Sequence, residues 1–531
     1  MYLLFPGRHH LLTDFQFKYL IQVILAGLEK QLDVFDEPIG IREKIEGIIF
    51  AVTSANHSNT RRNPVPFYLR TLAIQEFANQ LHIPAYIFGI DDVGNLGNFA
   101  SYTIKRIQHE SDGLLTIHPA NTVVISSTPV MKMYLELGFK ILPAELECLE
   151  TQKMKTDQPW DIVEYIATCD KDWTKDTFVL NSMHPASYKT WKTYGLGEKV
   201  TLLFNDKIIG EDGDLTATRD YNSYVRQMDE IAQKKYDDVS AFVKPGRIGD
   251  IGCAVGSWMK LACEDAKLRE SDFYGIEVSR HLFDICQQRK YNGEFKNPFI
   301  FFSQKNAVTG LVFQNSSMDT IFTSSLTHEI ESYGGREDLL NFISNRHQEL
   351  AHGGVWVNRD VVGPENATEE VYIWLNKEDG NNDSFDTGFA DRTELATYLK
   401  SLSTYSKFRR FACDFRQKEG FKLVFEEVVI DDKPYIKTSL NNATEFMTKK
   451  DYHDNWQSEM HETFCFWSFS DWKQHMESAG FSINPQSKAF TNDWIVENRW
   501  KESVKLFKLE DSELISQNYP VTTMFLIANK I

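Results

Sequence analysis

The segment Gly249-Asp-Ile-Gly-Cys-Ala-Val-Gly-Ser257 is the part of the sequence best suited to hold a ligand. It follows an apolar stretch typical of a strand and opens an expected helix. A ligand can lie against the main chain only where Cβ atoms are absent, which points to Gly252 and Gly256. Free amides at the helix start favour a carboxylate, and Asp250 can accept hydrogen bonds. Taken alone, such a turn also fits an ordinary strand–helix connection or a dinucleotide site.

A second acid, Glu277, ends the next expected strand, twenty-one residues after Gly256. A carboxylate at this place can accept hydrogen bonds from both hydroxyls of a ribose. Because dinucleotide-binding enzymes carry a similar acid, this spacing narrows the ligand only to a nucleoside.

The order of the segments that follow resembles the class I S-adenosylmethionine-dependent methyltransferases. In that family an acid-x-Gly-x-Gly-x-Gly segment precedes the ribose acid, and a later strand ends in an Asp-Ala pair beside the adenine. The matching residues here are Asp250, Gly252, Ala254 (in place of the middle glycine), Gly256, Glu277, Asn306 (in place of Asp) and Ala307. The resemblance covers roughly 220–360 and 465–531. It implies an S-adenosylmethionine site formed by these residues together with Cys253 and Ser325.

Candidate catalytic groups follow the fourth expected strand of this region, where His328 and Glu329 stand side by side. Methyl transfer depends mainly on positioning the acceptor, and a base helps when the acceptor is a hydroxyl or a protonated amine. An imidazole suits that role at neutral pH, although His328 could instead cap a helix or line the cofactor pocket. His461, beside Glu462, either faces the acceptor or packs among core aromatics. Asp360 either contacts the acceptor or caps a turn.

The first part of the chain, to about residue 200, resembles the nicotinamide-nucleotide adenylyltransferase branch of the HxGH nucleotidyltransferases. The resemblance is carried by Phe5-Pro-Gly-Arg-His-His10 and by the segment from Val52 to Arg70. It implies a site for ATP or another nucleotide. The residues that would form this site are Gly7, Arg8, Thr13, Gln16, Ser54 and Arg70.

That second family uses two histidines to hold the nucleotide phosphates, and their places fall on Thr13 and Gln16. Glutamine cannot carry a positive charge, and no arginine of the family's later motif stands near 155–160. We therefore expect a nucleotide-binding domain whose own activity is in doubt, fused to a working methyltransferase. A bifunctional adenylyltransferase/methyltransferase and a non-catalytic nucleotide-binding scaffold are the alternatives.

The elements that must position these residues alternate between strand and helix, which is typical of parallel α/β sheets. We expect two Rossmann-like doubly wound domains, at 1–210 and 215–531, joined by a linker at 210–214. An aromatic-rich insertion at about 363–465 interrupts the second domain. The insertion either covers the acceptor or forms the core of a small subdomain.

The composition limits the classes of partner that we expect. A net charge of −18 disfavours nucleic acid and favours a small-molecule or nucleotide-linked substrate. Seven cysteines without a CxxC pair indicate reduced thiols and no metal site. The first residues lack a cationic leader, and no apolar run is long enough for a membrane span. We therefore expect a cytoplasmic protein without a membrane anchor, whose oligomeric state stays open.

Overall fold

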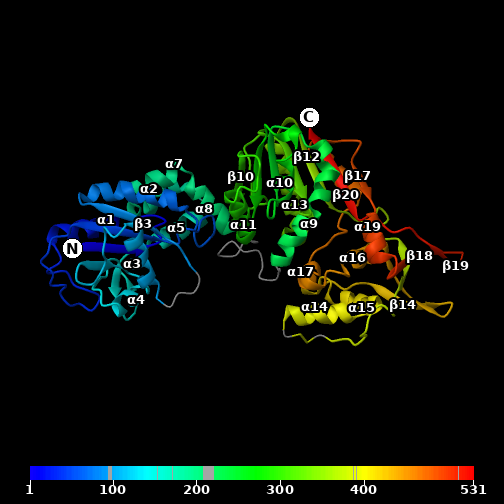
Figure 1. The fold of residues 1–531 in the computed structure, drawn as a ribbon, viewed down its shortest axis with the longest axis horizontal. Coiled ribbons are helices and arrows are strands. Elements are labelled where there is room, and N and C mark those ends of the chain that lie inside the picture. Colours follow the sequence, from blue (N-terminus) through cyan, green and yellow to red (C-terminus); the bar gives the residue numbers. More distant parts are fainter. Residues whose placement is uncertain are drawn as a thin grey trace. The chain divides into compact units, whose positions relative to one another are not determined.

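The computed structural model describes residues 1–93, 98–151, 153–169, 171–206, 221–386, 388–389, 391–511 and 513–531. The chain divides into two compact units, Met1–Gly213 and Asp214–Ile531, whose elements are labelled in Figure 1. The linker expected at 210–214 falls outside the described residues. None of the described helices is both long and apolar enough to cross a bilayer.

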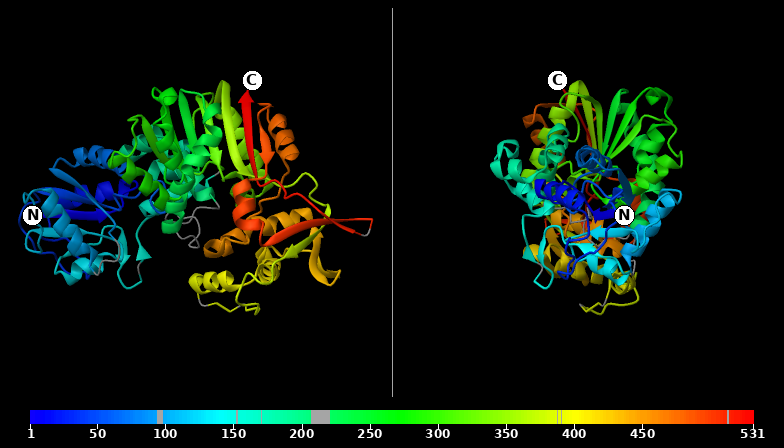
Figure 2. Two further views of the ribbon diagram at one scale, coloured as in Figure 1. Left: turned by 45° about the vertical axis from the view of Figure 1, so that its right-hand side comes forward. Right: turned by 90° about the vertical axis from the view of Figure 1, so that its left-hand side faces the viewer.

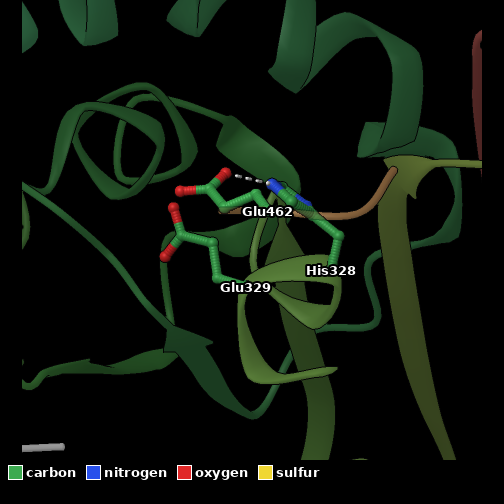
Figure 3. A group of neighbouring side chains, drawn as sticks. All are labelled: His328, Glu329 and Glu462. Carbon is green, nitrogen blue, oxygen red and sulfur yellow. Dashed lines mark ion pairs between the residues drawn. The ribbon is translucent and has the colours of Figure 1, made fainter. Parts of the chain in front are cut away.

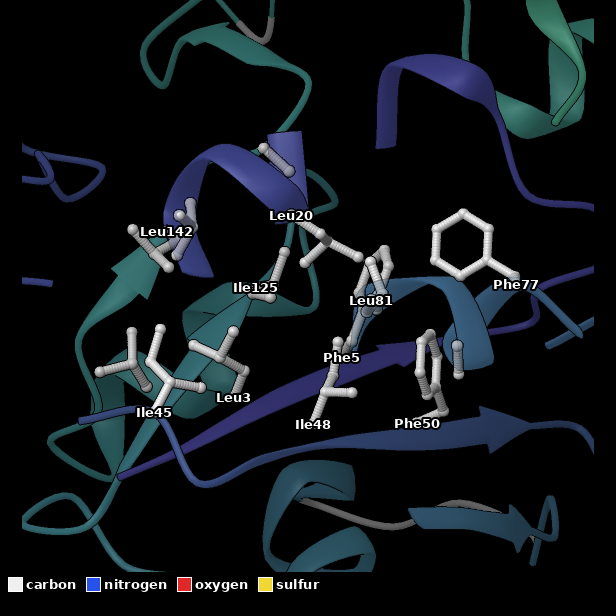
Figure 4. Packing of buried hydrophobic residues seen from close by; sticks show 14 of the residues in the cluster. Leu3, Phe5, Leu20, Ile45, Ile48, Phe50, Phe77, Leu81, Ile125 and Leu142 are labelled. Carbon is white, nitrogen blue, oxygen red and sulfur yellow. The ribbon is translucent and has the colours of Figure 1, made fainter. Parts of the chain in front are cut away.

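The first unit is built on a parallel sheet with the strand order β3-β2-β1-β4-β5. Its strands are β1 (Tyr2–Gly7), β2 (Gly47–Thr53), β3 (Ala85–Ile90), β4 (Thr122–Ile125) and β5 (Ile141–Leu142). Successive side chains of a strand point to opposite faces. Leu3 and Phe5 accordingly enter the core beneath α1 (Asp14–Ala26) and α2 (Phe67–Ala78), which Figure 4 shows. Leu4 enters the core beneath α3 (Phe99–Glu110) and α4 (Met131–Glu136).

The rest of the first unit is largely helical. It comprises β6 (Leu146–Cys148), β7 (Lys153–Met154), α5 (Pro159–Thr168), α6 (Thr177–Ser182), α7 (Pro185–Thr193) and α8 (Leu196–Asn205). Ile162 and Trp191 of this part share a core with Leu11 and with Leu69 of α2. The helical segment therefore packs back onto the parallel sheet's own helices.

The main sheet of the second unit has the order β10-β9-β8-β11-β12-β20-β16, and β17 also pairs with β20. Strands β8 to β12 run parallel, whereas β20 is antiparallel to its neighbours. The bounds are β8 (Arg247–Ile251), β9 (Asp272–Glu277), β10 (Ile300–Gln304), β11 (Met318–Ser324), β12 (Leu350–Val361), β16 (Phe481–Ile483), β17 (Lys488–Phe490) and β20 (Thr523–Lys530).

Helices cover both faces of this sheet. One core joins the sheet to α9 (Tyr221–Val239), α10 (Ser257–Ala262) and α11 (Arg280–Tyr291). The other joins it to α12 (Thr327–Gly334), α13 (Arg336–Glu349) and α18 (Phe469–Ser478). Along β12, Val355 and Val357 enter the first core while Trp356 enters the second. The expectation of an α/β protein with parallel sheets is thus confirmed.

A smaller antiparallel sheet, β14-β15-β13-β18-β19, follows β12 in the chain. Its strands are β13 (Glu370–Leu375), β14 (Phe425–Ile430), β15 (Lys433–Ser439), β18 (Val504–Glu510) and β19 (Glu513–Ser516). The helices with it are α14 (Arg392–Ser401), α15 (Thr404–Asp414), α16 (Leu440–Lys449), α17 (Trp456–Glu459), α19 (Asp493–Ile495) and the π-helix η7 (Val496–Trp500).

This smaller sheet draws on two stretches of chain. Figures 1 and 2 show the red strands β18 and β19 extending from the same layer as the yellow strand β14. Trp500 shares a buried core with Phe408, Phe446 and Trp456. The subdomain therefore includes residues beyond the expected insertion at 363–465, because the segment around 493–516 supplies two of its strands.

Candidate active site

A cavity of about 890 Å³ lies in the second unit, at the edge where β8, β9 and β11 end. Parallel strands carry their carboxyl ends to the same edge, which is where ligands bind in open α/β sheets. Residues that follow those strands line one side of the cavity. Residues of α15, η7 and the segment after α16 line the other side.

The turn after β8 presents bare main chain to this cavity. Gly252 has a φ of +71°, and a Cβ added there would stand 3.1 Å from Leu326 Cδ1. Cys253 and Ala254 also line the cavity, as does Ser325 after β11. All four of these residues are expected at the cofactor site from the sequence, and in the structure they line one cavity.

Three other expected cofactor residues are not among the described residues that line the cavity. A Cβ on Gly256 would meet the rings of Phe295 and Phe302, so this glycine serves the packing of the turn. The Asn306 Oδ1 accepts a hydrogen bond from the amide of Val308 at 2.9 Å. The Ala307 carbonyl accepts one from Arg346.

Glu277 is buried at the end of β9 and faces the cavity. Its Oε2 accepts a hydrogen bond from the Ala254 amide at 2.9 Å, and its Oε1 accepts one from the Ser279 amide at 2.8 Å. Burial raises the pKa of Glu277 to about 7, although the backbone hydrogen bonds lower it. Each carboxylate oxygen keeps a second lone pair. Glu277 can therefore accept hydrogen bonds from two hydroxyl groups of a ligand.

Asp250 and Lys235 bring a carboxyl and an amino group to the same cavity. Asp250 is 3% exposed, and burial raises its pKa to about 8. Burial and the charge of Arg359 lower the pKa of Lys235 to about 8. Neither side chain makes a hydrogen bond or ion pair with another described residue. The pair is therefore suited to a ligand that carries both an ammonium and a carboxylate group.

Lys235 is a site residue that the sequence analysis missed. Its helix, α9, reads as an ordinary polar helix, but Ala232, Tyr236 and Val239 are buried. Lys235 follows Ala232 by three residues and precedes Val239 by four, so it lies on the apolar stripe of the helix. A lysine on such a stripe is the signal that could have identified it.

His328, in the first turn of α12, lies between two buried carboxylates. Its Nδ1 is 2.7 Å from Asp360 Oδ1, and its Nε2 is 3.5 Å from Glu462 Oε2. Asp360 Oδ2 also accepts hydrogen bonds from the Thr327 amide and hydroxyl, at 2.7 Å and 2.6 Å. Figure 3 shows that Glu462 comes from a distant segment to meet the imidazole. Asp360, which is not among the described residues that line the cavity, therefore orients the ring and caps the first turn of α12.

The two carboxylates bear on the role expected for His328 as a base, which stays a prediction. Burial alone would lower its pKa, but the carboxylates of Asp360 and Glu462 raise it well above the usual value. A protonated imidazole cannot accept a proton, which leaves Glu329 and Glu462 as the candidate proton acceptors on this wall. With a neutral ring, His328 would instead offer, together with Glu329 and Glu462, ligand atoms that lie within 4.8 Å of one another.

His461 does not belong to the described lining of the cavity, contrary to the expectation that it faces the acceptor. Its Nδ1 pairs with Glu419, and its ring packs against Tyr333 with a centroid separation of 4.7 Å. Glu462, its neighbour, turns inward to His328 instead. Of the predicted pair, Glu462 lines the cavity, whereas His461 connects the segments that carry Glu419 and Tyr333.

In the first unit, Thr13 and Gln16 are committed to internal hydrogen bonds. The Thr13 hydroxyl accepts from the Gln16 amide, and the Gln16 Oε1 accepts from the Thr13 amide, so the two form a helix cap. The Gln16 Nε2 donates to Glu145 Oε1 at 2.7 Å. The buried carboxylate of Glu145 beside Gln16 would repel a phosphate group, so it disfavours phosphate binding by Thr13 and Gln16.

Arg70 is likewise turned inward. It is fully buried, and its guanidinium donates to the carbonyls of Arg8, Thr53, Ser54 and His57. Arg8 donates to the carbonyl of Arg62, and Gly7 packs against the ring of His9. Arg70 thus holds the ends of β1 and β2 together, and the nucleotide-binding role expected for these residues stays a prediction.

Comparisons with known proteins find likeness in structure but not in sequence. No family model and no curated protein matches the chain. Among solved structures, it is similar to an S-adenosylmethionine-dependent methyltransferase from Methanosarcina mazei at 12% identity and a TM-score of 0.28, over 56% of this chain and 98% of the other. It is also similar to geranyl diphosphate C-methyltransferase from Streptomyces coelicolor at 9% identity and a TM-score of 0.29, over 60% and 86%. Neither score reaches 0.5, so neither likeness bears on function.

Proposed function

We propose that the second unit is an S-adenosylmethionine-dependent methyltransferase acting on a small-molecule acceptor. The observation that carries this proposal is the set of groups around one end of the cavity. Bare main chain at Gly252, the carboxylate of Glu277 and the side chains of Asp250 and Lys235 all face it. S-adenosylmethionine carries a ribose, an ammonium and a carboxylate, and each finds a complementary group here.

A dinucleotide is the main competing ligand, and two features disfavour it. Its pyrophosphate would meet the buried acids Asp250 and Glu277, which line the cavity at the ends of β8 and β9. The sheet also departs from the dinucleotide-binding order 3-2-1-4-5-6, because the antiparallel β20 separates β12 from β16. Both features favour a nucleoside with an amino-acid tail.

When bound, S-adenosylmethionine supplies an electrophilic methyl group on a sulfonium. The protein's task is then to orient the acceptor and to take up any proton that the acceptor releases. Glu462 is placed for that task, since His328 and the hydroxyl of Tyr333 hold its carboxylate. Asp360 in turn orients the His328 ring that faces Glu462.

We do not extend catalysis to the first unit. Nucleotidyl transfer needs cationic groups against the phosphates, and Arg70 is used for internal hydrogen bonds while Gln16 bonds to Glu145. The bifunctional alternative therefore has no observation in its favour.

The proposal is tested by isothermal titration of the full chain with S-adenosylhomocysteine and, separately, with NAD. We expect one S-adenosylhomocysteine bound per chain and no heat from NAD. Glu277→Gln should weaken the binding at least roughly tenfold, because a charged acceptor contributes about 1.5–3 kcal/mol. Glu337→Gln, which changes an exposed acid of α13, should leave it unchanged. Binding of NAD in place of S-adenosylhomocysteine would overturn the proposal.

A further inference from the structure

The far end of the cavity, formed by the antiparallel subdomain, has a chemistry of its own. Lys407 of α15, Lys450 after α16 and Arg499 of η7 all line it. These three cations come from separate segments of chain, and none of them is used in the cofactor site described above.

Two of these cations share one carboxylate as a hydrogen-bond partner. The Asp451 carboxylate accepts hydrogen bonds from Lys450 Nζ at 2.9 Å and from Arg499 Nε at 2.8 Å. Arg499 also donates to the carbonyl of Thr448 at 3.0 Å. Asp451 is thus engaged by Lys450 and Arg499, and Lys407 is a third cation on the same part of the lining.

Lys407 is the unpaired member of the group. It is 9% exposed, and its ammonium makes no hydrogen bond or ion pair with any described residue. Asp379, a neighbouring acid, is directed to the amide and hydroxyl of Thr404, at 2.8 Å and 2.6 Å. Burying a charge without a partner is costly, so a cation held in this way points to a ligand of opposite charge.

His453 adds a second unused polar group at the same end of the cavity. Its Nε2 is buried and has no hydrogen-bond partner among the described residues. Burial and the charge of Lys407 lower its pKa to about 4, so the ring is neutral and can donate one hydrogen bond.

Two other acids on the lining pair with cations outside it. Asp454 pairs with Lys400 at 2.8 Å, and Glu497 pairs with Lys501 at 2.9 Å. Both partners lie outside the cavity lining among the described residues. Glu459 and Glu502 also line the cavity, so it is the buried side chain of Lys407, and not the net charge, that favours an anion here.

Aromatic rings connect this cationic end to the proposed reaction centre. The ring of Phe464 lies 5.0 Å from that of His328 and 6.5 Å from that of Tyr452. The guanidinium of Arg499 lies 5.0 Å from the Tyr452 ring. A flat or apolar group could rest along this wall between the two polar ends.

We propose that Lys407, Lys450, Arg499 and His453 form an oxyanion subsite that binds a carboxylate or phosphate group of the methyl acceptor. The acceptor's body lies along Phe464 and Tyr452, and its nucleophile lies at Glu462. This inference rests on the proposed function, because only a methyltransferase has a methyl acceptor. The subsite itself binds its anion with or without the cofactor.

The test uses the full chain and three small probes: benzoate, phenyl phosphate and the neutral benzyl alcohol. Titration calorimetry should show binding of one or both anions and none of the alcohol. Benzoate alone would identify a carboxylate, and phenyl phosphate alone would identify a phosphate. Equal binding of benzyl alcohol, or no binding of either anion, would overturn the proposal.

Lys407→Met provides the matching variant. It should weaken anion binding at least roughly tenfold, while Lys407→Arg restores it and the exposed-site control Lys418→Met has no effect. The melting temperature of Lys407→Met without ligand should rise, since the variant removes an unpaired buried charge. Unchanged anion affinity in Lys407→Met would contradict the subsite.

The same titrations separate the two proposals. Lys407→Met should bind S-adenosylhomocysteine as the parent protein does. Anion binding without S-adenosylhomocysteine binding would sink the proposed function and leave the subsite standing, and the reverse result would sink the subsite alone.

Discussion

His328 Nδ1 lies 2.7 Å from Oδ1 of Asp360, and both side chains are buried at the end of the cavity where α12 begins. The contact connects the start of α12 to the end of β12. It also decides the charge of the imidazole, because a buried carboxylate at hydrogen-bond distance favours the protonated ring.

Replacing Asp360 with Asn should lower the pKa of His328, since the neutral amide no longer stabilises the imidazolium. Because the folded-state pKa is raised, this ion pair stabilises the protein below the ordinary value of 6.5 and loses its effect as the pH rises through the folded-state value. NMR titration of the ring carbon resonances measures both proteins. A ring in the parent protein that is already neutral at pH 7 would contradict this assignment.

The affinity for S-adenosylhomocysteine should depend on pH through Glu277. Its pKa is about 7 in the empty site, and hydroxyl donors favour the ionised form. Near pH 6 only about one-tenth of the sites are ionised, so binding should be roughly tenfold weaker than near pH 8. Calorimetry in buffers of different ionisation enthalpy should detect proton release. No proton release, or the same pH dependence in Glu277→Gln, would argue against this role.

The same shift has a consequence for the unliganded protein. A carboxyl whose folded-state pKa is raised stabilises the fold below its ordinary value of 4.5 and loses that contribution as the pH rises through about 7. The added stability from S-adenosylhomocysteine should therefore be larger at neutral pH than under acid conditions, which thermal unfolding with and without ligand can measure.

Gly252→Ala tests the bare main chain. Both Gly252 and Gly293 have positive φ, at +71° and +72°, so an alanine at either place carries a similar backbone cost of about 1 kcal/mol. A Cβ on Gly252 meets Leu326 at the cavity, whereas one on Gly293 meets no described heavy atom within 4 Å. Only Gly252→Ala should weaken S-adenosylhomocysteine binding. Equal effects of the two variants would show that strain alone is being measured.

Arg70→Leu should destabilise the first unit without changing S-adenosylhomocysteine binding. The change removes several charge-assisted hydrogen bonds and leaves buried carbonyls unpaired, which costs roughly 3 kcal/mol. Hydrogen–deuterium exchange of β1 and β2 in the full chain should become faster. Unchanged exchange together with a loss of ATP binding would instead restore the nucleotide-binding role.

The sequence predicts those site residues whose positions follow from the order of the parallel strands. Asp250, Gly252 and Glu277 stand at the ends of adjacent parallel strands, so their spacing along the chain predicts that they meet. The same holds for His328 and Asp360, which follow β11 and lie near the end of β12. Local periodicity and parallel-sheet geometry were sufficient for this half of the site.

The other half could not be read from spacing. Lys407, Lys450 and Arg499 converge only because β13, β15 and β18 pair as an antiparallel sheet. Likewise, the side-chain amide of Gln16 donates a hydrogen bond to Glu145, which is 129 residues away in the sequence. Burial and pairing of such side chains are properties of the tertiary fold, so no local motif predicts which polar groups stay available to a ligand.

A crystal structure of the full chain with S-adenosylhomocysteine would examine the proposed site most directly. We expect the ribose hydroxyls within hydrogen-bond distance of the Glu277 carboxylate, the amino-acid tail between Asp250 and Lys235, and the sulfur directed toward Glu462. A cavity that excludes the nucleoside, or one that binds it with its ribose away from Glu277, would contradict the account.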